Sequence, residues 1–231
     1  MKTYSAIDDC VIGGLDAPCF ANLLPEEIEL IKDSKTQVLF RKGESLTKQG
    51  AFASSVLFVV EGLVRQYITG DTNRDFNLRI IRNSQFIGLS AAFSKHTYEY
   101  STVALKETLA CLIEKDAIAM LIKKNGDFAY GLINRYYEND SSLYDTIRSM
   151  MYKQMHGRLA DVLLYLDSIR YNGESVFSYL SRKEVADFAG LSTESTVKLL
   201  KGFEKDGLIR LVDKNIELIK KEALVDISRR G

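Results

Sequence analysis

The sequence predicts an α+β fold in which an antiparallel β-roll, a long helix and a winged helix-turn-helix follow one another. Three changes in the spacing of apolar residues support this order. Short apolar runs broken by Gly, Asn and Asp occupy residues 37–113, a helical spacing follows at 127–154, and two short helices with a hairpin begin at 181. We therefore expect three domains: a β-roll sensor with an N-terminal helix at 1–126, a dimerisation helix at 127–156 and a winged helix-turn-helix at 157–231.

The composition limits the classes of protein to which the chain can belong. Its 231 residues carry 31 Lys and Arg against 31 Asp and Glu, so the formal net charge is zero and a surface for nucleic acid has to be local. No apolar run approaches the ~20 residues needed to cross a bilayer, and the N-terminus lacks the pattern of a secretory signal. We expect a cytoplasmic protein without a membrane partner.

The cysteines and histidines predict no metal site. Cys10, Cys19 and Cys111 form no CxxC pair, and an odd number of cysteines is a poor disulfide framework. His96 and His156 are too few and too scattered for a zinc site. We expect reduced thiols and ordinary imidazoles.

The first zone predicts a succession of short strands. Pro25, followed by Glu26 and Glu27, indicates a helix that precedes them, because Pro suits the first turn and acids favour the positive end of the helix dipole. Glu61-Gly62 predicts a hairpin, since Gly supplies the positive φ that a tight turn needs. Regularly spaced short strands are typical of a sandwich or roll. The strand-like runs are residues 38–40, 56–60, 63–68, 76–81, 86–88 and 101–113.

The second zone predicts one long helix with an apolar stripe. A helix of about 28 residues with so narrow a stripe favours pairing with a second copy, as in a coiled coil. The alternative is that the helix packs against its own domain. Within the stripe, Asn139 either fixes the pairing register or faces solvent. The predicted dimer interface consists of Phe128, Leu132, Tyr136, Asn139, Leu143, Ile147 and Met150.

The third zone predicts two helices joined by a tight turn. Ser181 and Glu184 form a capping box, and Gly190 permits the left-handed turn that ends the first helix. Ser192 then caps a second helix, which stops at Gly207. Two helices joined in this way are a helix-turn-helix unit.

The exposed side of that second helix carries the candidate DNA contacts. Glu194 can accept a hydrogen bond from a cytosine amino group, and Lys198 can donate to guanine or phosphate. Ser192, Ser195 and Lys201 suit phosphate contacts, which set position rather than sequence. The residues expected to face the core are Leu191, Val197, Leu200 and Phe203. The expected DNA-binding residues are Ser192, Thr193, Glu194, Ser195, Lys198 and Lys201, at the helix end that enters a major groove.

A wing follows the second helix. Residues 208–212 and 216–219 predict two strands around the turn at 213–215. From Gly157 onward there are thirteen Lys and Arg against twelve Asp and Glu, so DNA affinity must depend on placement and should fall steeply with salt. A helix-turn-helix that serves only protein contacts is the alternative.

The segment from Leu180 to Ile209, LSRKEVADFAGLSTESTVKLLKGFEKDGLI, resembles the helix-turn-helix of the cyclic-AMP receptor protein/FNR superfamily. Residues 40–50, 57–64 and 86–88 are similar to that family's β-roll, a cyclic-nucleotide-binding-like jelly roll. The resemblance covers nearly the whole chain in the family's order. It implies a bacterial homodimeric transcription regulator that bends a pseudo-palindromic operator in double-stranded DNA. It also implies contact with RNA polymerase if the protein activates, and an effector or redox signal that shifts the dimer between DNA-competent and incompetent states.

The resemblance also assigns roles on the second helix. Glu194 falls on the family's base-reading glutamate. Lys198 stands where the family usually has a base-reading arginine, and lysine reproduces the charge but not the planar fork. Thr193 occupies a position that is often Arg, Val or Pro, so the half-site sequence does not follow from the resemblance.

The sensor departs from the cyclic-nucleotide members of the family. Those members hold the ligand with Gly-Glu after the Phe-Ile run and an Arg-Ser pair on a later strand. Here Leu89 follows Gly88, and Tyr100-Ser101 stands where Arg-Ser would be, so a buried cyclic phosphate would lack its charge partner. We predict that cyclic AMP does not bind and that an unidentified small molecule occupies a pocket formed by Phe86, Gly88, Leu89, Tyr100 and Ser101.

Other signals and other classes of protein stay open at this point. Three cysteines do not supply the four ligands of an iron–sulfur cluster. A haem-based gas or redox sensor with His96 as axial ligand is one alternative, and control by abundance alone is another. A regulatory cyclic-nucleotide-type module that acts through protein contacts is a third, but it gives the helix-turn-helix no role. No catalytic motif is found, so an enzyme is not expected.

Overall fold

The computed structural model describes residues 2–3, 20, 23–93 and 96–231, and the side chains at 2–3 and 138–140 are outside that description. Cys10 and Cys19 therefore lie outside the described residues. The chain divides into a first unit, residues 1–69 with 79–140, and a second unit, residues 70–78 with 141–231. The division falls inside α3 (Gly126–Tyr152). The domain limits expected at residues 126 and 156 therefore stay predictions.

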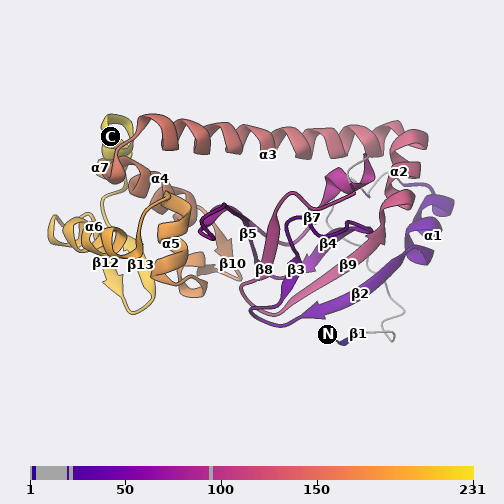
Figure 1. Cartoon of the computed structure of the whole chain (residues 1–231), viewed down its shortest axis with the longest axis horizontal. Helices are drawn as coiled ribbons and strands as arrows, with labels where there is room; N and C mark the ends of the chain where they lie inside the picture. The colour runs from indigo at the N-terminus through magenta and orange to yellow at the C-terminus, as the bar shows by residue number, and fades with distance from the viewer. Residues whose placement is uncertain (1, 4–19, 21–22, 94–95) are drawn as a thin grey trace. The chain divides into compact units, whose positions relative to one another are not determined.

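Two antiparallel sheets form the roll, as the sequence predicts (Figure 1), and all their strands lie in the first unit except β6 (Asp75–Ile81), whose first residues belong to the second. The five-stranded sheet has the order β1 (Lys2–Thr3), β2 (Lys35–Phe40), β9 (Thr108–Glu114), β4 (Ser55–Glu61), β7 (Gln85–Ile87). The four-stranded sheet has the order β3 (Ser45–Thr47), β8 (Ser101–Ala104), β5 (Val64–Thr69), β6 (Asp75–Ile81). The α+β roll is confirmed.

Glu61-Gly62 is not a hairpin, and this prediction was wrong. β4 and β5 belong to different sheets, so the chain crosses from one sheet to the other at Gly62. Gly62 has φ 143°, and a Cβ at this position would lie 2.3 Å from the Oγ1 atom of Thr108. Glycine is therefore required by the close approach of two segments as well as by the backbone conformation. A glycine turn looks the same in a sequence whichever sheet the next strand joins.

The apolar run at residues 101–113 is two strands rather than one. The chain leaves β8 after Ala104 and enters β9 at Thr108. The intervening Leu105 N–H donates to the carbonyl oxygen of Leu63 at 2.8 Å, so this crossing lies beside the crossing at Gly62.

Four phenylalanines form the centre of the core of the first unit. Phe20 packs on Phe58, Phe86 and Phe128 with ring centroids 5.1, 5.6 and 5.9 Å away, and Phe58 lies 5.0 Å from Phe86. The helices α1 (Pro25–Asp33) and α2 (Lys115–Lys124) contribute buried residues to the same core. The sequence predicts the start of α1 at Pro25 but does not anticipate α2. Packing on this scale is the main source of stability in such a unit.

The second unit is mainly helical (Figure 1). A hairpin, β10 (Arg170–Tyr171) and β11 (Glu174–Ser175), turns at Asn172 and Gly173, both of which have positive φ as a tight hairpin turn requires. The other elements are α4 (Met155–Asp167), α5 (Arg182–Ala189), α6 (Thr193–Lys205), β12 (Ile209–Val212), β13 (Asn215–Leu218) and α7 (Lys221–Arg230). The predicted helix-turn-helix and wing are confirmed, whereas α7, which packs on α4, was not anticipated.

Candidate functional site

The turn between α5 and α6 is built by local hydrogen bonds. The Ser181 hydroxyl accepts from Glu184 N–H at 3.2 Å, and the Glu184 carboxylate accepts from Ser181 N–H at 2.7 Å. Gly190 ends α5 with φ 63°, in the left-handed region. Both features satisfy backbone groups that a helix end leaves unpaired. They fix where α6 begins, which is the helix end that the sequence predicts to meet DNA.

Ser192 caps α6, as the sequence predicts. Its hydroxyl accepts from Ser195 N–H at 3.1 Å and donates to the Ser195 hydroxyl at 2.9 Å. The two serines are thus engaged with each other, which leaves the hydroxyl hydrogen of Ser195 as the donor for a further partner.

The exposed side of α6 presents the predicted polar residues. Thr193, Glu194, Lys198 and Lys201 are exposed, and Ser195 is half-buried. In the described part of the chain, Glu194 and Lys198 have no ion-pair partner. The charged ends of both side chains are thus available for an external ligand.

The buried side of α6 differs from the prediction at one position. Leu191, Leu200 and Phe203 are buried, but Val197 is only half-buried and Thr196 is completely buried. Thr196, Leu200 and Phe203 follow one line at the spacing of a helix face, and threonine has nearly the shape of valine. The Thr196 hydroxyl is buried without a hydrogen-bond partner in the described chain. Sequence reasoning did not single out Thr196.

The wing is a hairpin with a two-residue loop. Val212 pairs with Asn215, so Asp213 and Lys214 form the loop. The side chains of Arg210 and Glu217 form an ion pair across the two strands. Arg182, the first residue of α5, donates hydrogen bonds to backbone carbonyl oxygens of the loop. Burial lowers the pKa of Arg182 from its ordinary value. Sequence reasoning did not single out Arg182.

The residues of the predicted effector pocket have different surroundings in the roll. Gly88, with φ 72°, donates its N–H to the Tyr100 hydroxyl at 2.8 Å, and burial raises the pKa of Tyr100. The Ser101 hydroxyl accepts from Gln49 N–H at 3.0 Å. Phe86 belongs to the phenylalanine core, and Leu89 is half-buried against the same core. The structure brings Gly88 and Tyr100 together but directs Phe86 and Ser101 elsewhere.

A second tyrosine closes the space around Gly88. A Cβ at Gly88 would lie 2.5 Å from Cε1 of Tyr98, and the Tyr98 hydroxyl donates to the carbonyl oxygen of Ser55 at 2.8 Å. No sequence signal pointed to Tyr98, because its contact with Gly88 depends on how the strands fold back.

Cys111 and His96 lie in different surroundings. Cys111 is buried and its Sγ accepts from Gln37 Nε2 at 3.7 Å, whereas His96 is exposed. Within the described residues, no group of three or more His, Cys, Asp or Glu is placed to hold a metal ion.

The predicted dimer stripe needs correction at its first two residues. Phe128 and Leu132 are 0 % and 2 % exposed and belong to the core of the first unit, so these residues of α3 pack against their own domain. Met150 is half-buried, whereas Tyr136, Leu143 and Ile147 are exposed. The Asn139 side chain lies outside the described residues.

A second stripe of α3, which shares Ile147 with the predicted one, carries exposed apolar side chains. Tyr130, Tyr137, Tyr144 and Met151 recur every seven residues, and Ile133 and Ile147 fall between them at the second position of the same repeat. All six are exposed, for example Tyr137 at 72 %. A seven-residue apolar repeat is the pattern of a coiled-coil seam. We call these six residues the α3 seam.

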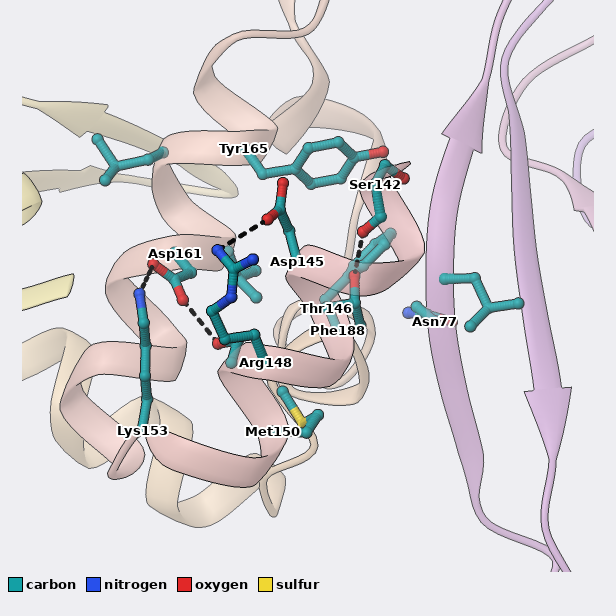
Figure 2. A pocket seen from close by; sticks show the side chains of 14 residues that line it. Asn77, Ser142, Asp145, Thr146, Arg148, Met150, Lys153, Asp161, Tyr165 and Phe188 are labelled. Atoms are coloured by element: carbon teal, nitrogen blue, oxygen red, sulfur yellow. Dashed lines mark hydrogen bonds and ion pairs between the residues drawn. The ribbon is translucent and has the colours of Figure 1, made fainter. Parts of the chain in front are cut away.

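The second unit has a cavity of about 360 Å³ between the end of α3, α4 and α5 (Figure 2). Asp161 lies at its edge and accepts hydrogen bonds from Ser149 Oγ at 2.6 Å and Lys153 Nζ at 2.8 Å. The Ser228 hydroxyl of α7 also donates to Asp161 and accepts from Lys153. Asp161 thus ties the end of α3 to α4 and α7.

The chain is similar to known proteins in both of its units. Residues 37–125 match the family model of the cyclic nucleotide-binding domain, and residues 157–227 match that of the Crp-like helix-turn-helix domain. The chain is 25 % identical over 218 residues to the cyclic AMP receptor protein of Thermus thermophilus, which covers 92 % of this chain and 97 % of that protein. It is 24 % identical over 220 residues to the transcriptional activator protein FnrA of Stutzerimonas stutzeri, and the matched region covers 91 % of this chain and 87 % of that protein.

A solved structure shares the fold. A transcriptional regulator of the Crp/Fnr family from Eubacterium rectale superposes with a TM-score of 0.74 at 21 % identity, which covers 92 % of this chain and 98 % of that one. Among the described helices, none combines the length and the apolar character needed to cross a membrane.

Proposed function

The chain belongs to the Crp/Fnr superfamily of transcription regulators, which are DNA-binding proteins and not enzymes. On this basis we propose that it reads a pseudo-palindromic operator as a homodimer. The observation that carries the proposal is the exposed face of α6, on which Glu194 and Lys198 project from the capped helix end without partners in the described chain. This is the end of a recognition helix that enters a major groove.

Base reading is assigned to the charged pair on α6. Glu194 and Lys198 are four residues apart, so they lie one helical turn apart on the same side of the helix. A carboxylate accepts from the cytosine amino group, and an ammonium donates to guanine or to phosphate. Ser195 and Lys201 flank them and are assigned to backbone phosphates, together with the helix N-terminus at Ser192.

Pairing is assigned to the α3 seam, which shares Ile147 with the stripe that the sequence predicts. Because Phe128 and Leu132 are used inside the first unit, they have no side chain to offer a second copy. The exposed Tyr137 and Ile147 instead follow the seven-residue repeat that knobs-into-holes packing requires. A two-fold dimer would place two α6 helices in successive major grooves, about 34 Å apart.

The sensor is proposed to respond to something other than cyclic AMP. Leu89 and Tyr100 supply no charge for a cyclic phosphate, and the Gly88 N–H is already bonded to the Tyr100 hydroxyl. A buried anion without a charge partner would cost several kcal/mol, because each charged hydrogen bond contributes about 1.5–3 kcal/mol. Isothermal titration calorimetry with cyclic AMP is expected to detect no binding, and a micromolar dissociation constant would overturn this part of the proposal.

Selection of an operator from random duplexes tests the DNA-binding function directly. Purified protein is expected to enrich a two-fold symmetric sequence and to lose affinity as salt rises. Glu194→Ala should relax base preference by about 1–3 kcal/mol at one position of each half-site. Lys201→Ala should weaken all sequences alike and serves as the matched control. A strictly monomeric protein that is indifferent to duplexes of every sequence would contradict the proposal.

A further inference from the structure

We propose that Arg182 is the positioning residue of the wing, and that it holds the wing loop so that Lys214 meets a backbone phosphate of DNA. The second half of this inference rests on the proposed DNA-binding function, whereas the first half concerns the protein alone. The two halves are therefore tested separately below.

One guanidinium binds three successive carbonyl groups. Arg182 Nη1 donates to the carbonyl oxygen of Lys214 at 3.1 Å, and Nη2 donates to those of Asp213 at 3.0 Å and Asn215 at 3.5 Å. The donor belongs to the first turn of α5, more than thirty residues earlier in the chain. A single side chain thus joins the first helix of the helix-turn-helix to the turn of the wing.

The wing loop has a conformation that is unfavourable for the residues that form it. Two-residue hairpin loops favour Gly or Asn at positions of positive φ, and this loop is Asp213-Lys214 without any glycine. Asp213 has φ 51°, a conformation that costs energy for a residue with a Cβ. Each strand of the wing is only four residues long, so the ladder itself is short. Three carbonyl dipoles that converge on one cation offset these costs.

Only arginine fits this geometry. Its planar fork offers five N–H donors, so it can bind neighbouring carbonyls at the same time, whereas the ammonium of lysine is a point charge. The acceptors named above are neutral carbonyls, so the interaction leaves the wing with the full positive charge of the guanidinium. Arg182 is half-buried, which strengthens its hydrogen bonds relative to those of a solvated side chain.

Lys214 is the residue of the wing loop that we assign to the phosphate contact. It lies at the tip of the wing and is exposed. A phosphate oxygen is the natural partner of an exposed ammonium at the rim of a DNA-binding surface. Arg182 acts on this contact through the backbone of the loop.

Hydrogen exchange of the DNA-free protein tests the positioning role. In Arg182→Lys and Arg182→Gln, backbone amides of residues 209–218 are expected to exchange on the order of tenfold faster, because the loop loses hydrogen bonds to a charged donor. Amides of α5 and α6 are expected to keep their protection, which shows that the fold is intact. Lys183→Gln is the matched control, since Lys183 is the next residue and pairs with Asp187 instead of the wing. Unchanged exchange of the wing in both Arg182 variants would overturn the proposal.

A double-mutant cycle on the selected operator tests the consequence for DNA. Lys214→Ala should reduce the salt dependence of binding by about 0.9 per subunit, the value for one phosphate contact. Arg182→Lys keeps the net charge, yet it should reduce the salt dependence by a similar amount. The double variant should bind no more weakly than the weaker single variant.

The outcomes separate the two levels of the proposal. Additive losses in the cycle would mean that Arg182 acts on DNA independently of Lys214, and the assigned role would be wrong. If no duplex binds, the proposed function fails, while the exchange experiment still decides whether Arg182 holds the loop.

Discussion

The exposed face of α6 and the turn at Gly88 use polar groups in opposite ways. On α6, Glu194 and Lys198 extend into solvent and have no ion-pair partner among the described residues. At Gly88, the backbone N–H is bonded to Tyr100, and the neighbouring Ser101 hydroxyl is bonded to Gln49 N–H. A ligand of α6 has to displace only water, whereas a ligand beside Gly88 has to displace internal hydrogen bonds. Binding in the roll would therefore be coupled to a change in the structure of the roll itself.

Among the changes that test this comparison, we expect the largest loss of stability when a side chain in the core of the roll is truncated. Phe58→Ala is expected to lower the free energy of unfolding by about 3–5 kcal/mol, because Phe58 is completely buried between Phe20 and Phe86. Glu194→Ala should change it by less than about 0.5 kcal/mol, since its side chain is exposed. Urea unfolding followed by circular dichroism measures both. Equal losses would remove the distinction between the two regions.

The helix α3 has both a face that is buried in the first unit and an exposed apolar face, the α3 seam. Ile147→Lys is expected to weaken dimerisation by at least about 100-fold, or ~2.8 kcal/mol, because an ammonium would enter an apolar seam. Ser142→Lys places the same charge five residues away on the opposite side of α3 and should leave the dimer intact. Sedimentation equilibrium measures both constants. A stable Ile147→Lys dimer would exclude the assigned seam.

Removal of the Tyr100 hydroxyl tests whether the turn at Gly88 depends on the hydrogen bond between them. Tyr100→Phe should cost about 1–3 kcal/mol, because it leaves the Gly88 N–H without its acceptor. Tyr98→Phe, which removes the donor to the Ser55 carbonyl, is the comparison variant. Thermal unfolding measures the loss. Should Tyr100→Phe be as stable as the parent, water or another group must satisfy Gly88.

The same tyrosines predict a loss of stability at high pH. Burial raises the pKa of Tyr98 and of Tyr100 above the ordinary value of 10.0. The folded protein therefore keeps protons that the unfolded chain releases, so this contribution to stability is complete below about pH 10 and is lost as the pH rises above it. Urea unfolding between pH 8 and 11 should show a decline that is smaller in Tyr100→Phe. A pH-independent midpoint would contradict the assignment.

The smallest expected effect concerns the buried side of α6. Thr196→Val should leave stability unchanged or raise it by up to ~1 kcal/mol, because the buried hydroxyl has no partner and valine has a similar shape. DNA affinity should not change, since the exposed face is untouched. A clear loss of stability would indicate that the hydroxyl has a partner, such as a bound water.

Local signals predicted the geometry of the helix-turn-helix unit. The capping box at Ser181, the left-handed Gly190 and the cap at Ser192 each act within four residues of the chain, so their geometry follows from sequence alone. The exposed residues of α6 followed from helical spacing. Arg182 could not be found in this way, because its partners lie more than thirty residues away.

Long-range pairing limited what could be predicted in the roll. The strand runs were recognisable, but nothing local distinguishes a hairpin at Gly62 from a crossing between sheets. The position of Tyr98 against Gly88 has the same origin. Both depend on contacts between segments that are distant in the chain.

The order of the domains, the helix-turn-helix with its caps and the residues exposed on α6 follow from the sequence alone, because caps, glycine turns and periodicity are local properties. Which apolar residues of α3 are exposed depends instead on how the chain folds. Aromatic and aliphatic residues surround much of that helix, so spacing alone allows more than one stripe. The burial of Phe128 and Leu132 in the core of the first unit removes the start of the predicted stripe, whereas every residue of the α3 seam is exposed. Burial is settled by what packs against a residue, and that is a property of the folded chain.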